Sequence, residues 1–418
     1  MTKPPPLRND CFALPPGVHW TPVDEALALL QSRMSGVTET EDLPVAEALG
    51  RVLAEPAVAE RSHPPHANCA VDGYALTGAQ YGEGIHRVPL CEGRSAAGQP
   101  FDGTVPDTHA LRVLTGANLP EGTDTVILQE DVQLEDGHIA FHGPLKIGAN
   151  ARKAGEDVQV GETLFPAGHR LTPADLGLLS ATGVGRVKLH KPLRVAVIST
   201  GDELAEAWAV ASDDQIYDAN RPMLLAAIKK LGHEPIDMGR MPDQRDVLKD
   251  GLTRAAQEAD VILTSGGASA GDEDHMSALL NETGSMTLWR LAIKPGRPLA
   301  LGMWAGTPVF GLPGNPVAAK VCTLIFAKPA MDALGGAGWQ EPVALRVPAA
   351  FSKSKKAGRR EYLRARLRNG RAEVFKSEGS GRISGLSWAE GLVELPDEAM
   401  DVQEGTEVLY FPYSAFGL

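Results

Sequence analysis

The stretch Leu263-Thr-Ser-Gly-Gly-Ala-Ser-Ala-Gly-Asp-Glu-Asp274 carries most of what this sequence says about its fold. It continues an apolar run over residues 260–264, whose length and β-branching are typical of a buried parallel strand. Gly266, Gly267 and Gly271 then break the run, so that backbone N–H groups can surround an anionic oxygen. Three acidic residues follow directly, and their negative charge would repel an anion bound to the loop. A divalent cation that bridges the carboxylates and a phosphate would remove this repulsion. Taken alone, the segment is equally compatible with a glycine-rich loop that has a solvated acidic edge.

Three further segments favour the binding site. Apolar strands are predicted over 193–200 and 309–312, and they run into Gly201-Asp-Glu203 and Leu312-Pro-Gly-Asn-Pro316. Between them, two prolines stiffen Lys294-Pro-Gly-Arg-Pro298, which presents two cations. Because ligands of open α/β sheets sit beyond the carboxyl ends of the strands, we expect these loops to converge on one crevice. Carboxylates, cations and glycine turns together predict a site for phosphate and a metal.

Composition sets independent bounds. A chain of 418 residues exceeds one ordinary core and suggests about two to four domains. No apolar run approaches the roughly 20 residues that span a bilayer, so no membrane partner is expected. The net charge of −13 argues against nucleic acid as the main partner. The four cysteines have neither metal nor redox spacing, which predicts a cytoplasmic protein.

Patterning along the chain predicts a multidomain α/β plus β protein. Residues 22–54 show helical periodicity, including a second helix over 43–53. Residues 58–144 have the Gly, Pro and short β-branched runs of a small β-rich domain, with boundaries drawn at those residues. Strands alternate with amphipathic helices over 191–338, which predicts an α/β domain with a parallel sheet. Short alternating strands over 339–418 indicate a compact C-terminal β-barrel, in which the arginine run 359–368 is interpreted as a solvated strand face.

The motifs in combination resemble one family. The glycine-rich loop, Gly201-Asp-Glu-Leu204, Lys294-Pro-Gly-Arg-Pro298 and Leu312-Pro-Gly-Asn-Pro316 look like those of the molybdopterin molybdenumtransferases, of the MoeA and gephyrin E-domain type. Outside the α/β region, the segments that strengthen the resemblance are Ala70-Val-Asp-Gly-Tyr-Ala75, Leu114-Thr-Gly-Ala117 and Asp124-Thr-Val-Ile-Leu-Gln-Glu130. The resemblance runs from about Val23 to Leu418. It implies that residues 1–57 and 145–190 form one elongated N-terminal helical and β domain in two segments.

Molybdenum cofactor biosynthesis is the function that the resemblance implies. The reaction would be Mg²⁺-dependent insertion of molybdate, a substrate, into adenylylated molybdopterin, with release of AMP. The resemblance also implies a homodimer, in which the α/β domain of one subunit and the β-rich domain of the other form one cleft. Further implied partners are the adenylyltransferase of the same pathway and the enzymes that accept the cofactor.

The resemblance further implies which residues bind and react. The substrate-binding set would hold the pterin nucleotide and comprises Ser265, Gly266, Gly267, Ser269, Lys294, Gly296, Arg297, Pro313, Gly314, Asn315 and Pro316. The implied catalytic residues are Asp72, Thr115, Glu203, Asp243 and Asp274. Glu203, Asp243 and Asp274 would bind Mg²⁺, which prefers oxygen ligands. Asp72 and Thr115 would orient molybdate or the water that attacks the phosphoanhydride.

The segment around Asp72 departs from the family pattern. Family members usually have Phe-Asp-Asn-Ser-Ala-Met-Asp-Gly-Tyr. Here His66, Ala67, Cys69 and Val71 replace the Phe, the first Asp, the Ser and the Met, so the upstream carboxylate is lost while Asp72 is kept.

Three alternative functions remain open at this point. A molybdopterin adenylyltransferase shares the α/β domain and catalyses the preceding step, but it lacks the Asp72 domain and the C-terminal domain. Pyrophosphatases with a similar glycine-rich domain are disfavoured for the same reason. A non-enzymatic, gephyrin-like scaffold is the other alternative, and the retained carboxylates argue against a purely structural role.

Overall fold

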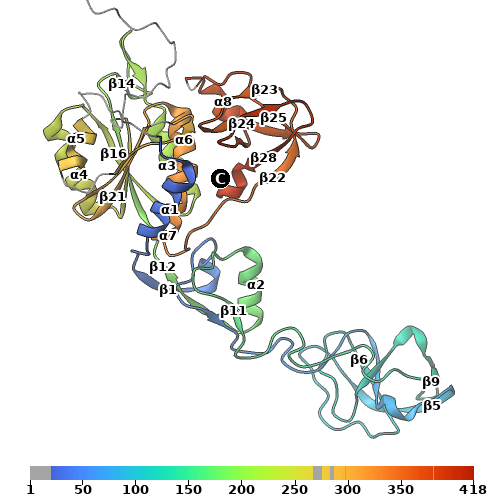
Figure 1. The fold of residues 1–418 in the computed structure, drawn as a ribbon. Helices are drawn as coiled ribbons and strands as arrows, with labels where there is room; N and C mark the ends of the chain where they lie inside the picture. The colour runs from blue at the N-terminus through green and yellow to red at the C-terminus, as the bar shows by residue number, and fades with distance from the viewer. Residues whose placement is uncertain (1–19, 267–274, 283–286, 297, 380) are drawn as a thin grey trace, which may run out of the picture. The chain divides into compact units, whose positions relative to one another are not determined.

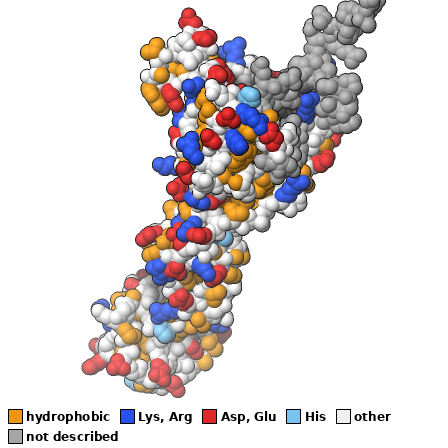
Figure 2. Space-filling view, turned by 90° about the vertical axis from the view of Figure 1, so that its left-hand side faces the viewer, with side chains coloured by type: hydrophobic (Ala, Val, Ile, Leu, Met, Phe, Trp, Pro, Cys, Tyr) orange, Lys and Arg blue, Asp and Glu red, His pale blue; other side chains and the backbone are white. Residues whose placement is uncertain are grey.

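The computed structural model describes residues 20–266, 275–282, 287–296, 298–379 and 381–418. The chain divides into two compact units (Figure 1). One unit comprises residues 42–189, and the other comprises residues 1–41 together with 190–418. On the face drawn in Figure 2, Lys and Arg side chains are interspersed with Asp and Glu side chains. Among the described residues, no helix is long and apolar enough to cross a membrane.

A six-stranded sheet builds most of the unit formed by residues 42–189. Its order is β7-β4-β6-β5-β9-β8. The strands are β4 (Gly73–Leu76), β5 (Gly84–Ser95), β6 (Ala110–Val113), β7 (Thr125–Leu128), β8 (Gln133–Glu135) and β9 (His138–Gly143). Gly73 opens β4 where a Cβ atom would lie 1.9 Å from the carbonyl oxygen of Ile127, so only glycine allows this strand to pair with β7.

A separate hydrophobic core in the same unit joins two chain segments. Val45 and Leu53 pack with Leu171, Leu179 and Leu189. Helix α2 (Pro173–Ala181) contributes to this core and begins with a capping box between Thr172 and Asp175. The two segments therefore share one core, although the domain boundaries given above stay a prediction.

The helix predicted over residues 43–53 is wrong. Helix α1 (Val23–Arg33) forms as the periodicity indicates, but Thr40–Pro44 is strand β1 and Val45–Glu47 is a single 3₁₀ turn. Pro44 has no N–H to donate, and Gly50 adopts a φ of +74° that ends any helical run.

The α/β part of the larger unit contains the predicted sheet. Its order is β16-β13-β17-β21-β20-β18, and the first four strands are parallel. Strand β20 runs antiparallel to β21, and β18 runs antiparallel to β20 and therefore in the direction of the first four strands. The strands are β13 (Arg194–Thr200), β16 (Glu234–Met241), β17 (Val261–Ser265), β18 (Thr287–Arg290), β20 (Pro298–Trp304) and β21 (Thr307–Leu312). The helices are α3 (Asn220–Lys230), α4 (Arg245–Glu258), α5 (His275–Glu282), α6 (Pro316–Cys322) and α7 (Lys328–Leu334), with the π-helical turn Thr323–Ala327 joining the last two.

Both faces of this sheet are covered, which explains its continuous apolar strands. On β13, Val195 and Val197 pack in one core with residues of α1, α3 and α6. Ala196 and Ile198 point the other way and pack with residues of α4 and α5. Figure 1 shows these two helical layers on opposite sides of the strands. Parallel strands buried on both faces are expected to be apolar throughout rather than alternating.

The C-terminal region is a β-rich domain, as the alternating strands predict. Its main sheet has the order β19-β24-β26-β28-β22. These strands are β19 (Ile293–Lys294), β22 (Leu345–Pro348), β24 (Arg360–Arg368), β26 (Gly391–Leu395) and β28 (Glu407–Pro412). Strand β19 belongs to the Lys294-Pro-Gly-Arg segment and pairs with β24. The C-terminal sheet therefore fixes a loop that the sequence places in the site.

Candidate functional site

Parallel pairing brings the predicted loops to one edge of the α/β sheet. Ser199 on β13 is in register with Ser265 on β17, and Ser265 is in register with Leu312 on β21. The backbone N–H of Gly266 donates to the carbonyl of Leu312 at 3.2 Å. A Cβ atom on Gly314 would lie 3.8 Å from the Gly266 Cα. Ser265, Gly266, Pro313, Gly314, Asn315 and Pro316 therefore lie together, whereas Gly267, Ser269, Asp274 and Arg297 lie outside the described residues.

Glycine is required at two of these turns. Gly266 has a φ of +97°, and a Cβ atom there would lie 2.6 Å from the Thr200 carbonyl oxygen. Gly201 has a φ of +144°, and a Cβ atom there would lie 2.6 Å from the carboxylate of Glu203. Close approach at Gly266 lets the loop after β17 touch the end of β13.

The acidic residues at this edge are only partly grouped. The backbone N–H of Asp243, which follows β16, donates to Oδ1 of Asp202 at 3.3 Å. Glu203 is exposed and lies over Gly201. Oxygen donors suit Mg²⁺ chemically. However, no group of three or more His, Cys, Asp or Glu side chains within the described part of the chain is arranged to hold a metal.

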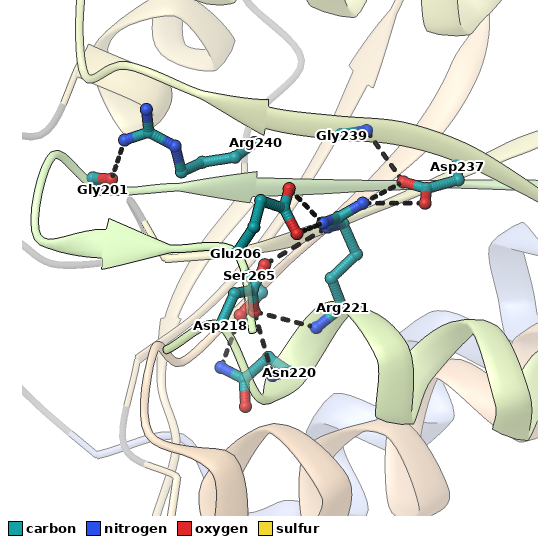
Figure 3. Close-up of polar contacts among 9 residues, drawn as sticks. All are labelled: Gly201, Glu206, Asp218, Asn220, Arg221, Asp237, Gly239, Arg240 and Ser265. Carbon is teal, nitrogen blue, oxygen red and sulfur yellow. Dashed lines mark hydrogen bonds and ion pairs between the residues drawn. The ribbon is translucent and has the colours of Figure 1, made fainter. Parts of the chain in front are cut away.

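A polar network behind the loops was missed by the sequence motifs (Figure 3). Asn220, the first residue of α3, donates from Nδ2 to Oγ of Ser265 at 2.6 Å and to the carbonyl of Gly314 at 2.7 Å. Arg221 is 7% exposed and binds Asp218, Asp237 and Glu206. The signal that could have found this network is the run Asp218-Ala-Asn-Arg221 ahead of a predicted helix, because Asp and Asn are typical helix-capping residues.

Asp72 and Thr115 are brought together in the other unit. The backbone N–H and the hydroxyl of Thr115 each donate to Oδ1 of Asp72 at 2.7 Å. The hydroxyl bond and then the backbone bond hold the pKa of Asp72 below its ordinary value. This carboxylate is therefore ionised and fixed in direction.

Lys294 is not free to meet a substrate directly. Its Nζ lies 2.6 Å from Oε2 of Glu378 and 3.6 Å from Oε2 of Glu361. Lys353 contacts the same two carboxylates. Burial raises the pKa of Glu378, but the hydrogen bonds from both lysines outweigh burial, so this pKa lies below its ordinary value. Nearby, a Cβ atom on Gly296 would lie 2.6 Å from Sγ of Cys322, so this turn also requires glycine.

A cavity of about 230 Å³ opens beside Lys294, between the α/β part and the C-terminal sheet. Lys353, Arg364 and Lys376 contribute to its lining. The interpretation of the arginine run as a solvated face is wrong for Arg364, which is 5% exposed. Its guanidinium donates to backbone carbonyls of Ser377, Gly379 and Arg382, because a buried cation needs acceptors.

Comparison with known proteins covers nearly the whole chain. Residues 21–183 match the MoeA N-terminal region (domain I and II), residues 196–333 match the probable molybdopterin binding domain, and residues 346–413 match the MoeA C-terminal region (domain IV). The molybdopterin molybdenumtransferase of Haemophilus influenzae is 35% identical over 94% of this chain and 98% of its own. That of a Nostoc species is 31% identical over 91% and 90% of the two chains.

Solved structures agree with these relatives. The molybdopterin biosynthesis MoeA protein of Pyrococcus horikoshii superposes with a TM-score of 0.83 at 31% identity and covers 94% of this chain and all of its own. The sequence match and the shared fold extend over every part described above. The chain therefore belongs to the molybdopterin molybdenumtransferase family.

Proposed function

We propose that this protein inserts molybdate into adenylylated molybdopterin in a Mg²⁺-dependent reaction that releases AMP and gives molybdenum cofactor. The observation that carries the proposal is the meeting of Ser265, Gly266 and Gly314 at the carboxyl edge of the sheet in a member of this family. Such an edge is where α/β sheets bind nucleotides. Matches to the N-terminal and C-terminal regions disfavour an adenylyltransferase, which would need only the α/β domain.

The α/β loops are proposed to hold the nucleotide part of the substrate. Ser265, Gly266 and the loop Pro313–Pro316 would surround the phosphates, together with Gly267 and Ser269. Lys294 and Arg297 would supply positive charge. Since Lys294 is paired with Glu378, an oxyanion that enters the cavity would have to compete with that carboxylate.

The carboxylates are proposed to divide into two groups. Glu203, Asp243 and Asp274 would hold Mg²⁺, which neutralises charge on the phosphoanhydride when bound. Asp72 and Thr115 would orient molybdate or the attacking water. Because Thr115 gives both of its hydrogens to Asp72, the carboxylate remains an acceptor that can position a water molecule.

A metal-insertion assay tests the reaction. Adenylylated molybdopterin is supplied with molybdate or tungstate, and AMP release and cofactor formation are followed with and without Mg²⁺. Glu203→Gln, Asp243→Asn and Asp274→Asn should each abolish Mg²⁺-dependent AMP release. Asp213→Asn, which changes another exposed acid after β13, is the matched control and should keep wild-type rates. Full AMP release by the three variants would remove these residues from the site.

The assembly and location are also proposals. We infer a homodimer, so light scattering should give twice the chain mass of 44.3 kDa. Adenylyltransferase and cofactor-accepting enzymes are proposed as further partners. A cytoplasmic location is supported by Cys69, Cys91 and Cys322, which are free thiols in the described structure.

A further inference from the structure

We propose that Asn220 is a positioning residue of the substrate site, which fixes the hydroxyl of Ser265 as a hydrogen-bond donor to a phosphate oxygen. The inference rests on the proposed function, because it concerns the phosphate part of the same nucleotide site. It adds a residue that lies 45 positions away from Ser265 and belongs to none of the four loop motifs.

Asn220 is held firmly in place. Its side chain is at the start of α3 and the residue is only 6% exposed. Oδ1 of Asp218 accepts the backbone N–H groups of Asn220 and Arg221, each at 3.1 Å, which caps the first turn of the helix. Figure 3 shows the Asn220 amide directed at Ser265.

The orientation of the amide is fixed by one of its partners. The carbonyl oxygen of Gly314 can only accept a hydrogen bond, so the Asn220 atom 2.7 Å from it must be the amide nitrogen. The same nitrogen lies 2.6 Å from Oγ of Ser265. Its two hydrogens are therefore shared between Gly314 and Ser265.

This arrangement sets the polarity of Ser265. A hydroxyl that accepts from Asn220 keeps its own hydrogen for another partner. Ser265 ends β17 directly before Gly266, at the edge where Gly314 also lies. Phosphate oxygens only accept hydrogen bonds, so Asn220 leaves the serine in the donor state that an anionic ligand requires.

The same amide ties two loops into one site. Ser265 belongs to the β17 loop and Gly314 to the β21 loop, and one side chain holds both. Oδ1 of Asn220 is buried and has no hydrogen-bond partner among the described residues. A buried acceptor left unsatisfied costs stability, so a hydroxyl or water that arrives with the ligand would be bound there.

Nucleotide binding to the purified full-length protein tests the inference. AMP and adenosine are the probes, because they differ only in the phosphate, and calorimetry gives both dissociation constants. Asn220→Ala should weaken AMP binding about ten-fold, as expected for one hydrogen bond to a charged group, and change adenosine binding less than about two-fold. Ser265→Ala should do the same. The double variant should lose no more than the stronger single variant, because both changes remove one interaction.

A matched control separates positioning from stability. Thr253→Val removes the hydrogen bond from Trp304 to Thr253 on α4, which is another side-chain hydrogen bond of the α/β part. It should leave AMP affinity unchanged at equal thermal stability. AMP binding by Asn220→Ala at wild-type strength would overturn the inference, and so would losses that multiply in the double variant.

Asn220→Asp covers the case in which the alanine variant does not fold. Its side chain has nearly the same shape, but its carboxylate would accept the Ser265 hydrogen, so AMP should bind more than about ten-fold more weakly while adenosine still binds. Wild-type AMP affinity in the folded Asp variant would refute the role of Asn220. If AMP binding responds to the variants as expected but the wild-type protein inserts no molybdate, the proposed function is wrong and the inference about Asn220 stands. A wild-type protein that does not bind AMP would overturn both.

Discussion

Asp72 shows how one residue acquires a property that its neighbours in sequence do not give it. The hydroxyl and the backbone N–H of Thr115, 43 positions later, lower the pKa of its carboxylate. The ionised form of the carboxylate is therefore favoured relative to an Asp without these two hydrogen bonds.

The first prediction is a change in the pH dependence of activity. Thr115→Val removes the hydroxyl bond, which is the main cause of the lowered pKa, and keeps the backbone bond, so the pKa of Asp72 should rise toward its ordinary value. A higher pKa means that more Asp72 is protonated at a given acidic pH. The acidic limb of the rate of molybdenum insertion should therefore move to higher pH. Thr115→Ser keeps the hydroxyl and should leave the acidic limb of the pH profile unchanged. If Thr115→Val and the wild-type protein have the same acidic limb, the hydroxyl does not have the proposed role.

At the scale of single elements, the N-terminus of α3 organises the segment that follows β13. Arg221 binds Glu206, which follows the strand β14 (Leu204–Ala205), and also binds Asp237 on β16 at 2.8 Å. Asp218 is only 6% exposed, and its carboxylate pairs with the same guanidinium. One side chain thus joins a helix, a strand and the loop that carries Glu203.

The second prediction concerns this network. Arg221→Met leaves Asp218 buried without its cation, so the free energy of unfolding in urea should fall by about 3–5 kcal/mol. Arg245→Met removes the exposed ion pair with Glu282 and should cost less than about 1 kcal/mol. Equal losses in the two variants would show that the Arg221 network behaves as a surface pair.

The third prediction concerns helix α6 and pH. Burial lowers the pKa of Lys320 to about 8, although the Tyr413 ring, 3.8 Å from its Nζ, attracts the ammonium. Between about pH 8 and 10 the unfolded state keeps a proton that the folded state has lost. Raising the pH should therefore stabilise the folded protein relative to Lys320→Met, by up to about 1.4 kcal/mol per pH unit in that window. Chemical unfolding at several pH values measures the difference, and parallel curves would contradict a lowered pKa.

At the scale of the whole molecule, the proposed homodimer would build each site from Asp72 of one subunit and the α/β loops of the other. The family resemblance implies two subunits, which would make two equivalent shared sites in a two-fold dimer. Asp274, the α/β residue used below, lies outside the described residues.

The fourth prediction is a complementation test. Asp72→Ala and Asp274→Asn should each be inactive, and they are denatured and refolded together. Half of the dimers should be mixed, and in each of these one site carries both lesions and the other none. Roughly a quarter of wild-type activity should return. Activity that stays at background, with mixed dimers confirmed by mass spectrometry, would show that each site is built within one subunit.

The sequence by itself determined the α/β domain, its sheet and the family. Residues 195–198 and 261–263 are apolar at every position, and such runs followed by glycine turns are local signals of parallel strands buried on both faces. The motif residues near Ser265 and Leu312 could be placed at one edge because parallel strands end together. The prediction was wrong where two local signals conflict. Residues 43–53 have helical periodicity, but Pro44 and Gly50 prevent a helix there.

Only the tertiary structure decided which residues far apart in the sequence meet. Asn220 with Ser265, Lys294 with Glu378 and Asp202 with Asp243 are pairs separated by 45, 84 and 41 positions. Periodicity and turn chemistry act over a few residues and carry no information about such distances. These contacts depend on the strand order and on the docking of β19 against the C-terminal sheet. The polarity of the Ser265 hydroxyl and the pairing of Lys294 follow from that packing, because a buried polar group takes its partner from whatever the fold places within hydrogen-bond distance.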